Sequence, residues 1–224
     1  MKIRSATAQD TEAIVLLLKQ SLGESLIKKT TSIWQFKHQD NPFGVSHVLV
    51  AEEKNSLIGV RAFMQWHWQL GDTIQTAYRA VDTATHPSHQ GKGVFKKLTL
   101  QALEEVAQKQ ARFIFNTPNS QSLPGYLKMG WKEVDKINVA LVPAIVYYFR
   151  FLFSSSTRRH SISETKLEEL CQLHNQALSQ KKMLFTPKTL QYLKWRYEIN
   201  PMQDYMVYSG SDLFHNAILS IEAF

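Results

Sequence analysis

Hydrophobic residues recur along the first 142 positions of the chain with two different periods. Segments rich in β-branched and aromatic residues predict strands. They lie at 3–6, 47–53, 57–70, 73–85, 112–117 and 131–142. Apolar residues three and four positions apart predict helices between these strands. The helices are expected around 13–18 and at 32–38, 94–110 and 122–129.

The order of these elements predicts the fold class. Two helices follow the first strand, and three consecutive strands joined by short turns then form an antiparallel sheet. A helix, a strand, a short helix and a last strand follow, so one βαβ crossover is embedded in a mostly antiparallel sheet. We therefore expect an α/β fold of the mixed α+β kind, with helices flanking one central sheet and a smaller C-terminal α/β region.

The stretch ATHPSHQGKGVFKKL, residues 84–98, joins a predicted strand to a predicted helix. Gly91 and Gly93 allow a turn with positive φ and leave no Cβ in the way of a ligand. The first turn of the following helix presents unpaired N–H groups, and such groups bind phosphate. The stretch is thus a phosphate-binding turn or an ordinary strand-to-helix loop. It is not a dinucleotide-binding signature, whose third glycine would fall on Lys96, nor a Walker loop, because no Gly-Lys-Ser/Thr is present.

Charge and composition narrow the class of partner and the cellular setting. The 224 residues include 26 basic and 19 acidic ones, and the formal net charge is +7. This surplus fits a partner that carries phosphates, such as a nucleic acid, an anionic membrane or a nucleotide-like cofactor. The single cysteine, Cys171, excludes a disulfide framework and agrees with a cytoplasmic location. The most apolar run, 139–153, is shorter than the roughly 20 residues that span a bilayer, so we expect it to pack in a core or between domains, with a membrane-surface role as the alternative.

The C-terminal part of the chain contains an echo of the N-terminal part. SIWQFKHQDNPFG near the start is matched by YLKWRYEINPMQD, with an offset of 161 residues for Trp34 and Trp195 and 159 for the two Asn-Pro pairs. We interpret this as a duplicated, incomplete unit, with chance as the alternative for motifs this short. The predicted organisation is an N-terminal domain (1–142), a linker (143–162) and a partial repeat or accessory region (163–224).

Two groups of residues in the N-terminal domain resemble the signatures of the GNAT acetyltransferase superfamily. The central motif of that family, Gln/Arg-x-x-Gly-x-Gly/Ala, is similar to the stretch from Gln90 to Phe95 after Pro87, with Phe95 in place of the last small residue. The second signature is an Asn, a Tyr seven residues later, then Lys-x-Gly and an aromatic residue. Here it is matched by Asn119, Tyr126, Lys128, Gly130 and Trp131.

The resemblance implies a GNAT-like sheet and acetyl-coenzyme A as the acyl donor. In the family, the strand before the glycine turn splays from its parallel neighbour, and its free backbone pairs with the pantetheine amides of the cofactor. The residues that correspond are Thr83, Ala84 and Thr85. The turn and the helix start would hold the pyrophosphate, through Gln90, Gly91, Lys92, Gly93, Val94, Phe95 and Lys96. Asn119 would contact the cofactor from the other side.

Acetyl transfer from a thioester to an amine needs a neutral amine, close approach of the reactants and a proton for the departing thiolate. The resemblance places Tyr126 at the family's proton-donor position. Asp82, just before the splayed residues, is the candidate base for the amine proton, although strand alternation turns its side chain to the face opposite that of Thr83. The rival bases are Glu52, His67 and His86.

The predicted function is an N-acetyltransferase in which the amine attacks acetyl-CoA directly in a ternary complex. The acceptor would be a small-molecule amine or the amine of a peptide or protein. The alternative is a non-catalytic module that binds coenzyme A or another partner, with Phe95 and the partial repeat as its departures from the family pattern. Nucleic acid is not expected, because the positive charge gathers at the glycine turn and not along an aromatic-lined face. No metal is expected, because His86 and His89 lack a third ligand. A homodimer is left open.

Overall fold

The computed structural model describes residues 1–23, 28–136, 163–203, 205–207 and 218–219. A six-stranded sheet forms its centre, in the order β1-β2-β3-β4-β5, with β6 pairing to β3. Its strands are β1 (Lys2–Ser5), β2 (His47–Glu53), β3 (Ser56–Leu70), β4 (Thr73–Thr85), β5 (Phe113–Phe115) and β6 (Leu184–Phe185). The pairs are antiparallel except β4 with β5, which is parallel. The predicted fold class, a mostly antiparallel sheet with one crossover, is confirmed.

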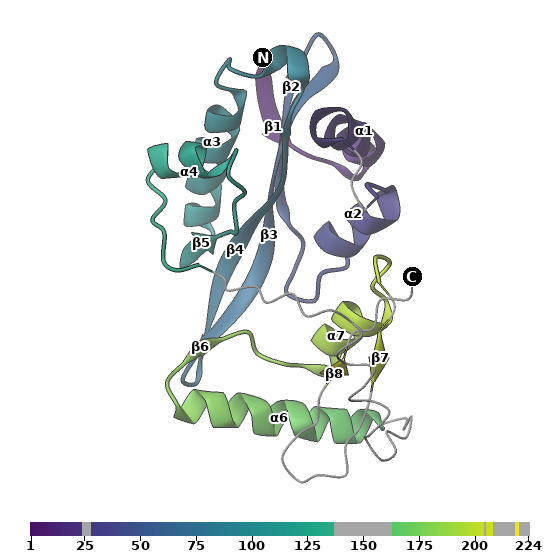
Figure 1. Cartoon of the computed structure of the whole chain (residues 1–224), viewed down its shortest axis with the longest axis vertical. Helices are drawn as coiled ribbons and strands as arrows, with labels where there is room; N and C mark the ends of the chain where they lie inside the picture. The colour runs from purple at the N-terminus through teal and green to yellow at the C-terminus, as the bar shows by residue number, and fades with distance from the viewer. Residues whose placement is uncertain (24–27, 137–162, 204, 208–217, 220–224) are drawn as a thin grey trace, which may run out of the picture.

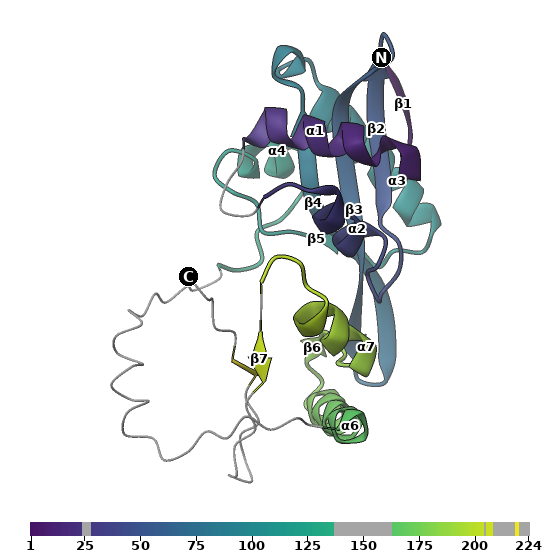
Figure 2. The same cartoon turned by 90° about the vertical axis from the view of Figure 1, so that its right-hand side faces the viewer.

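Helices cover both faces of this sheet (Figures 1 and 2). One face carries α1 (Thr11–Leu22) and α2 (Thr31–His38), and the other carries α3 (Val94–Gln108) and α4 (Leu123–Lys128). Each layer has its own core. On the α1 side, Ile14 and Leu18 pack on Val60 and Ala84 of the sheet. On the α3 side the buried residues include Leu98, Ala102, Val106, Leu49 and Phe63. Both faces of the sheet are therefore buried. A ligand can reach the sheet only where two neighbouring strands stop pairing.

Short elements complete the description. Two 3₁₀ turns precede α1 and α3, namely η1 (Ala8–Asp10) and η2 (Pro87–His89). The C-terminal region contributes α6 (Glu164–Gln180), α7 (Leu190–Leu193), the π-helical turn η3 (Lys194–Glu198), β7 (Met206–Val207) and β8 (Ile218–Leu219). In the described parts of the chain, no helix combines the length and apolar character that crossing a membrane requires.

The predicted last strand is wrong over residues 131–136, which form neither helix nor strand. Trp131 packs on the α3-side core, but residues 132–136 are exposed; Val134 is 95% exposed between two charged neighbours, so these residues have no apolar face to bury against β5. The remainder of that predicted strand, the linker at 143–162, the apolar run at 139–153 and parts of the predicted repeat (204, 208–217 and 220–224) lie outside the described residues.

The C-terminal region docks on the N-terminal domain through β6 and through Trp195, among other contacts. Strand β6 extends the sheet, with Phe185 opposite Gln69 of β3. Trp195 stacks on Phe36 of α2, with ring centroids 4.8 Å apart and planes inclined by 13°, and its Nε1 donates to the Phe36 carbonyl oxygen at 2.9 Å. Two buried aromatic rings and a satisfied indole N–H make this a well-packed contact.

The two echoed segments share their local structure at an offset of 159 residues and not at the 161 of the tryptophans. Thr30 caps the N-terminus of α2, and Thr189 caps that of α7 in the same way. Farther along, the side-chain oxygens of Asn41 and Asn200 each accept a hydrogen bond from the backbone N–H two residues on. With this offset, Trp195 of the second segment corresponds to Phe36 of the first. These are the two residues whose rings stack on each other.

The start of the chain is fixed by Asp10, which joins β1 to α1. The carboxylate of Asp10 accepts two hydrogen bonds from Arg4, both at 2.8 Å, and one from the Thr7 backbone N–H at 2.7 Å. The hydrogen bonds from Arg4 hold the pKa of Asp10 well below its usual range. The same carboxylate caps the start of a helix and forms an ion pair with β1. Asp10 therefore anchors the first strand to the first helix.

We expect Asp10→Ala to lower the free energy of unfolding by about 1 to 2 kcal/mol at pH 7, because a cap and a bidentate ion pair are lost together. The pKa of Asp10 is lower in the folded state, so its contribution is complete above the unfolded pKa of about 4 and is lost as the pH falls further. Urea titrations at pH 7 and below pH 4 measure this. Glu12→Ala, an exposed carboxylate in the first turn of α1, is the control. Equal effects of both variants would contradict the anchor role.

Candidate active site

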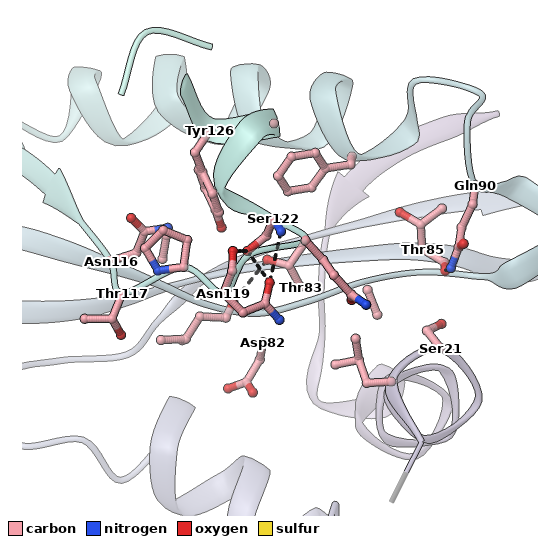
Figure 3. A pocket seen from close by; sticks show the side chains of 18 residues that line it. Ser21, Asp82, Thr83, Thr85, Gln90, Asn116, Thr117, Asn119, Ser122 and Tyr126 are labelled. Carbon is pink, nitrogen blue, oxygen red and sulfur yellow. Dashed lines mark hydrogen bonds between the residues drawn. The ribbon is translucent and has the colours of Figure 1, made fainter. Parts of the chain in front are cut away.

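Strands β4 and β5 separate after a short parallel pairing, and the gap between them opens a cavity. The two strands pair only from Ala77 with Phe113 to Arg79 with Phe115. Beyond that point residues 80–85 and 116–119 line opposite sides of a cavity of about 520 Å³ (Figure 3). The cavity is completed by Ser21 and Leu22 of α1 and by residues of α3 and α4. The splay that the family resemblance implied is present.

A β-bulge in β4 shapes the wall of this cavity. Ala62 of β3 pairs with Val81, and Val60 pairs with Ala84, so Asp82 and Thr83 lie opposite the single residue Arg61. Asp82 adopts a positive φ of 40°, a conformation that short polar side chains tolerate better than most. Such backbone outliers cluster at functional sites.

On the α3 side of the sheet, the bulge brings Thr83 to Arg61 and Tyr126. Arg61 is fully buried, and its Nη1 donates to the Tyr126 hydroxyl at 2.7 Å and also to Thr83 Oγ1. The guanidinium lies over the rings of Phe63, Tyr126 and Phe95, 4.7 to 5.7 Å from their centroids. Burial lowers the pKa of Arg61, and the hydroxyl of Tyr126 opposes this. Tyr126 is 5% exposed and lines the cavity from α4.

On the α1 side, Asp82 belongs to a separate group of polar residues. Its carboxylate accepts hydrogen bonds from Lys37 and from His38 Nε2, the latter at 2.9 Å, while His38 Nδ1 lies 2.8 Å from Ser46 Oγ. Burial lowers the pKa of His38 and outweighs the pull of Asp82, which leaves the ring neutral. Figure 3 shows Asp82 pointing away from Tyr126.

The basicity of Asp82 follows from these partners. Burial alone would raise the pKa of Asp82, but the hydrogen bond from His38 and the charge of Lys37 outweigh it and hold the pKa well below the ordinary value. Asp82 is therefore a stable carboxylate with little tendency to take a proton. Its side chain keeps 24% exposure where it lines the cavity.

The glycine turn lies where the sequence places it. Gly91 and Gly93 have φ values of 75° and 77°, and a Cβ built on either would meet nothing within 4 Å. Gly93 is the N-cap of α3, and the first intrahelical bond runs from Lys97 N to Gly93 O. The amides of the three residues between them precede the hydrogen-bond ladder of the helix. The turn is therefore open space at both glycines.

The predicted site residues fall into two groups. Those that line the cavity are Asp82, Thr83, Ala84, Thr85, Gln90, Phe95, Asn119 and Tyr126. Those that form the turn without lining the cavity are Gly91, Lys92, Gly93, Val94 and Lys96. Val94 is buried against Gly59, so only its backbone faces the turn. Asn119 accepts hydrogen bonds from the Ser122 N–H and hydroxyl, both at 2.9 Å, at the start of α4.

The three rival bases do not line the cavity. Glu52 pairs with Arg4 at 3.1 Å. His67 packs beside the ring of Phe43, 5.2 Å away, and His86 Nδ1 contacts Ser88 Oγ at 2.8 Å. Phe95 does not close the cleft: it packs edge-on against Tyr126, over Gly125, where a Cβ would lie 3.1 Å from its ring.

Comparison with known proteins agrees with this geometry. The family model described as an acetyltransferase (GNAT) domain matches residues 2–134. The chain belongs to the GNAT acetyltransferase family. No curated protein matches it.

Solved structures with the same fold are distant in sequence. A predicted acetyltransferase from Clostridium acetobutylicum, determined with acetyl-CoA, has a TM-score of 0.53 at 19% identity, covering 65% of this chain and 97% of that one. A GCN5-related N-acetyltransferase from Ralstonia eutropha has a TM-score of 0.51 at 16% identity, with coverage of 62% and 97%. An aminoglycoside 6'-N-acetyltransferase from Acinetobacter haemolyticus has 0.50 at 18%, with coverage of 64% and 99%.

Sequence reasoning missed the polar partners of the GNAT site. Lys37 and His38 come from α2, 45 and 44 positions before Asp82, and nothing local in the sequence links them to it. Arg61 had one available signal, because it is a lone cation inside the apolar stretch LIGVRAF. A charged residue at the centre of a buried strand is rare unless it is paired or functional.

Proposed function

We propose that this protein is an acetyl-CoA-dependent N-acetyltransferase in which an amine attacks the donor directly in a ternary complex. The observation that carries the proposal is the splayed β4–β5 gap, with Tyr126 on one wall and an open glycine turn at one end. Retention of a hydroxyl in the cavity favours an enzyme over a module that only binds coenzyme A.

Acetyl-CoA is the acyl donor. The family model supports this assignment, and the cavity fits the group, because a free strand edge lies beside a glycine turn that the protein's own atoms leave open. The backbone of residues 83–85 would hold the pantetheine arm, and the amides of the glycine turn would hold the pyrophosphate. The exposed Lys92, Lys96 and Lys97 add positive charge at this end. When bound, acetyl-CoA supplies an activated acyl group.

Tyr126 and Asp82 have different roles in the proposed reaction. The Tyr126 hydroxyl holds the proton that the leaving sulfur requires. Asp82 remains ionised and offers a carboxylate to the ammonium form of the acceptor, which orients the amine. The contacts of Asp82 favour this anchoring role over that of a base, so the amine proton would leave through water. One structural neighbour is named as an aminoglycoside N-acetyltransferase, and a cationic amine of that kind is the acceptor class that a permanent carboxylate at the cavity would suit.

The first prediction concerns the turn. Gly93→Ala places a methyl group on a residue at φ 77°, where it is strained and occupies open space at the turn proposed to hold the pyrophosphate. We expect the dissociation constant for acetyl-CoA to rise about tenfold, measured by calorimetry. Gly71→Ala is the matched control, since Gly71 has φ 55° and equal open space but lies in the β3–β4 turn. Equal loss of affinity in both variants would contradict the phosphate cradle.

The second prediction concerns the hydroxyl. Tyr126→Phe should reduce kcat about 10²- to 10⁴-fold, because a positioned proton donor is lost, while the affinity for acetyl-CoA stays within twofold. Thiol release with a panel of amines measures kcat, and calorimetry measures binding. If the variant instead loses affinity for acetyl-CoA but keeps a normal kcat when saturated, Tyr126 has a structural role. The non-catalytic module that binds coenzyme A would then be the better explanation.

The third prediction concerns the acceptor. Asp82→Asn should raise KM for a cationic amine about tenfold, with Asp40→Asn, an exposed residue just beyond α2, as the control for net charge. Because the pKa of Asp82 is held low, its ionisation should leave no acid limb in kcat/KM between pH 5 and 9. An acid limb that Asp82→Asn abolishes would instead identify Asp82 as the base.

A further inference from the structure

Arg61 is a buried charge that contacts no carboxylate among the residues the structure describes. It is 0% exposed, and its Nε and Nη2 have no hydrogen-bond partner among the described residues. Its two hydrogen bonds, to Tyr126 and to Thr83, both leave from Nη1. By contrast, Arg4 of the same protein pairs with both Asp10 and Glu52. Burying a cation without a counter-ion costs stability, so packing alone does not explain why Arg61 is present.

The hydrogen bonds around Arg61 determine where the Tyr126 proton points. A phenol has one O–H to donate, and its oxygen also accepts. Because Arg61 donates to this oxygen, the phenol proton points elsewhere. Thr83 does not receive it in the structure: its hydroxyl accepts from Arg61 and donates to the Val81 carbonyl oxygen at 3.3 Å. Among the described residues no acceptor for the Tyr126 proton is present, and the remaining direction is the cavity that Tyr126 lines.

We propose that Arg61 is a positioning residue of the reaction, which fixes the Tyr126 hydroxyl with its proton toward the cavity and stabilises the phenolate that remains after the proton is given. The inference rests on the proposed function. The three aromatic rings around the guanidinium exclude water, which strengthens its interaction with a phenolate.

The proton transfers balance with the amine, the sulfur, Tyr126 and water alone. As the new C–N bond forms, the C–S bond breaks and the sulfur leaves with its electron pair. The Tyr126 O–H bond breaks and an S–H bond forms, so a phenolate facing Arg61 remains. The attacking amine releases its proton to water, and water returns a proton to the phenolate before the next turnover. Arg61 keeps its own protons throughout, as an arginine is expected to do.

The test is a double-mutant cycle with Arg61→Met and Tyr126→Phe. Methionine fills a similar apolar volume, so Arg61→Met should fold with a Tm equal to or above that of the wild type. Its kcat should fall about ten- to a hundredfold, with the affinity for acetyl-CoA unchanged by calorimetry. In the Tyr126→Phe background the same change should cost no further kcat, because Arg61 acts through the missing hydroxyl.

Arg4→Met is the matched control and should behave in the opposite way, with a lower Tm and an unchanged kcat. Should Arg61→Met fail to fold, Arg61→Lys keeps a cation with a different donor geometry, and the same cycle applies. A wild-type kcat in the Arg61 variant, or an equal loss of kcat with and without the Tyr126 hydroxyl, overturns the inference. A wild-type kcat in Tyr126→Phe alone overturns the proposed proton donor instead, so the two failures are distinguishable.

Discussion

The β-bulge at Asp82 and Thr83 is the constraint on which the rest of the site depends. Tyr78 and Ala80 of β4 pack in the α3-side core, and strict alternation would send Asp82 to that same face, toward Arg61. The extra residue instead turns Asp82 to the α1 side, and Ala84 packs there as well. The one extra residue of the bulge thus places Asp82 beside Lys37 and His38 and keeps it away from Arg61.

Two separate electrostatic environments result on the two faces of one strand. On the α1 side, a carboxylate receives two donors, and the pKa of Asp82 falls. On the α3 side, Arg61 meets no carboxylate within the described part of the chain and instead contacts two hydroxyls and three rings. Had Asp82 paired with Arg61, each would have neutralised the other, and neither would be available to a substrate or to Tyr126. The separation costs folding free energy, which proteins tolerate mainly at functional sites.

Much of the fold could be predicted because its signals are local. The alternation over 73–85 gave both ends of β4, and the paired glycines identified the turn whose positive φ values the structure shows. The partners of Asp82 could not be predicted in this way. Lys37 and His38 look like the polar end of an ordinary amphipathic helix, and only the packing of α2 on the sheet brings them to β4. The bulge itself leaves no local mark, since Asp-Thr within a strand is compatible with regular pairing.

The C-terminal region is connected to this site through the same helix. Trp195 packs on Phe36, and its indole N–H donates a hydrogen bond to the Phe36 carbonyl oxygen. The next two residues of α2, Lys37 and His38, donate hydrogen bonds to Asp82. A helix of eight residues has little stability of its own, so tertiary contacts must hold it in place. Trp195 on one side and the sheet on the other provide them. The aromatic contact between the echoed segments therefore also fixes the position of Lys37 and His38, and with it the orientation of the carboxylate at the edge of the cavity.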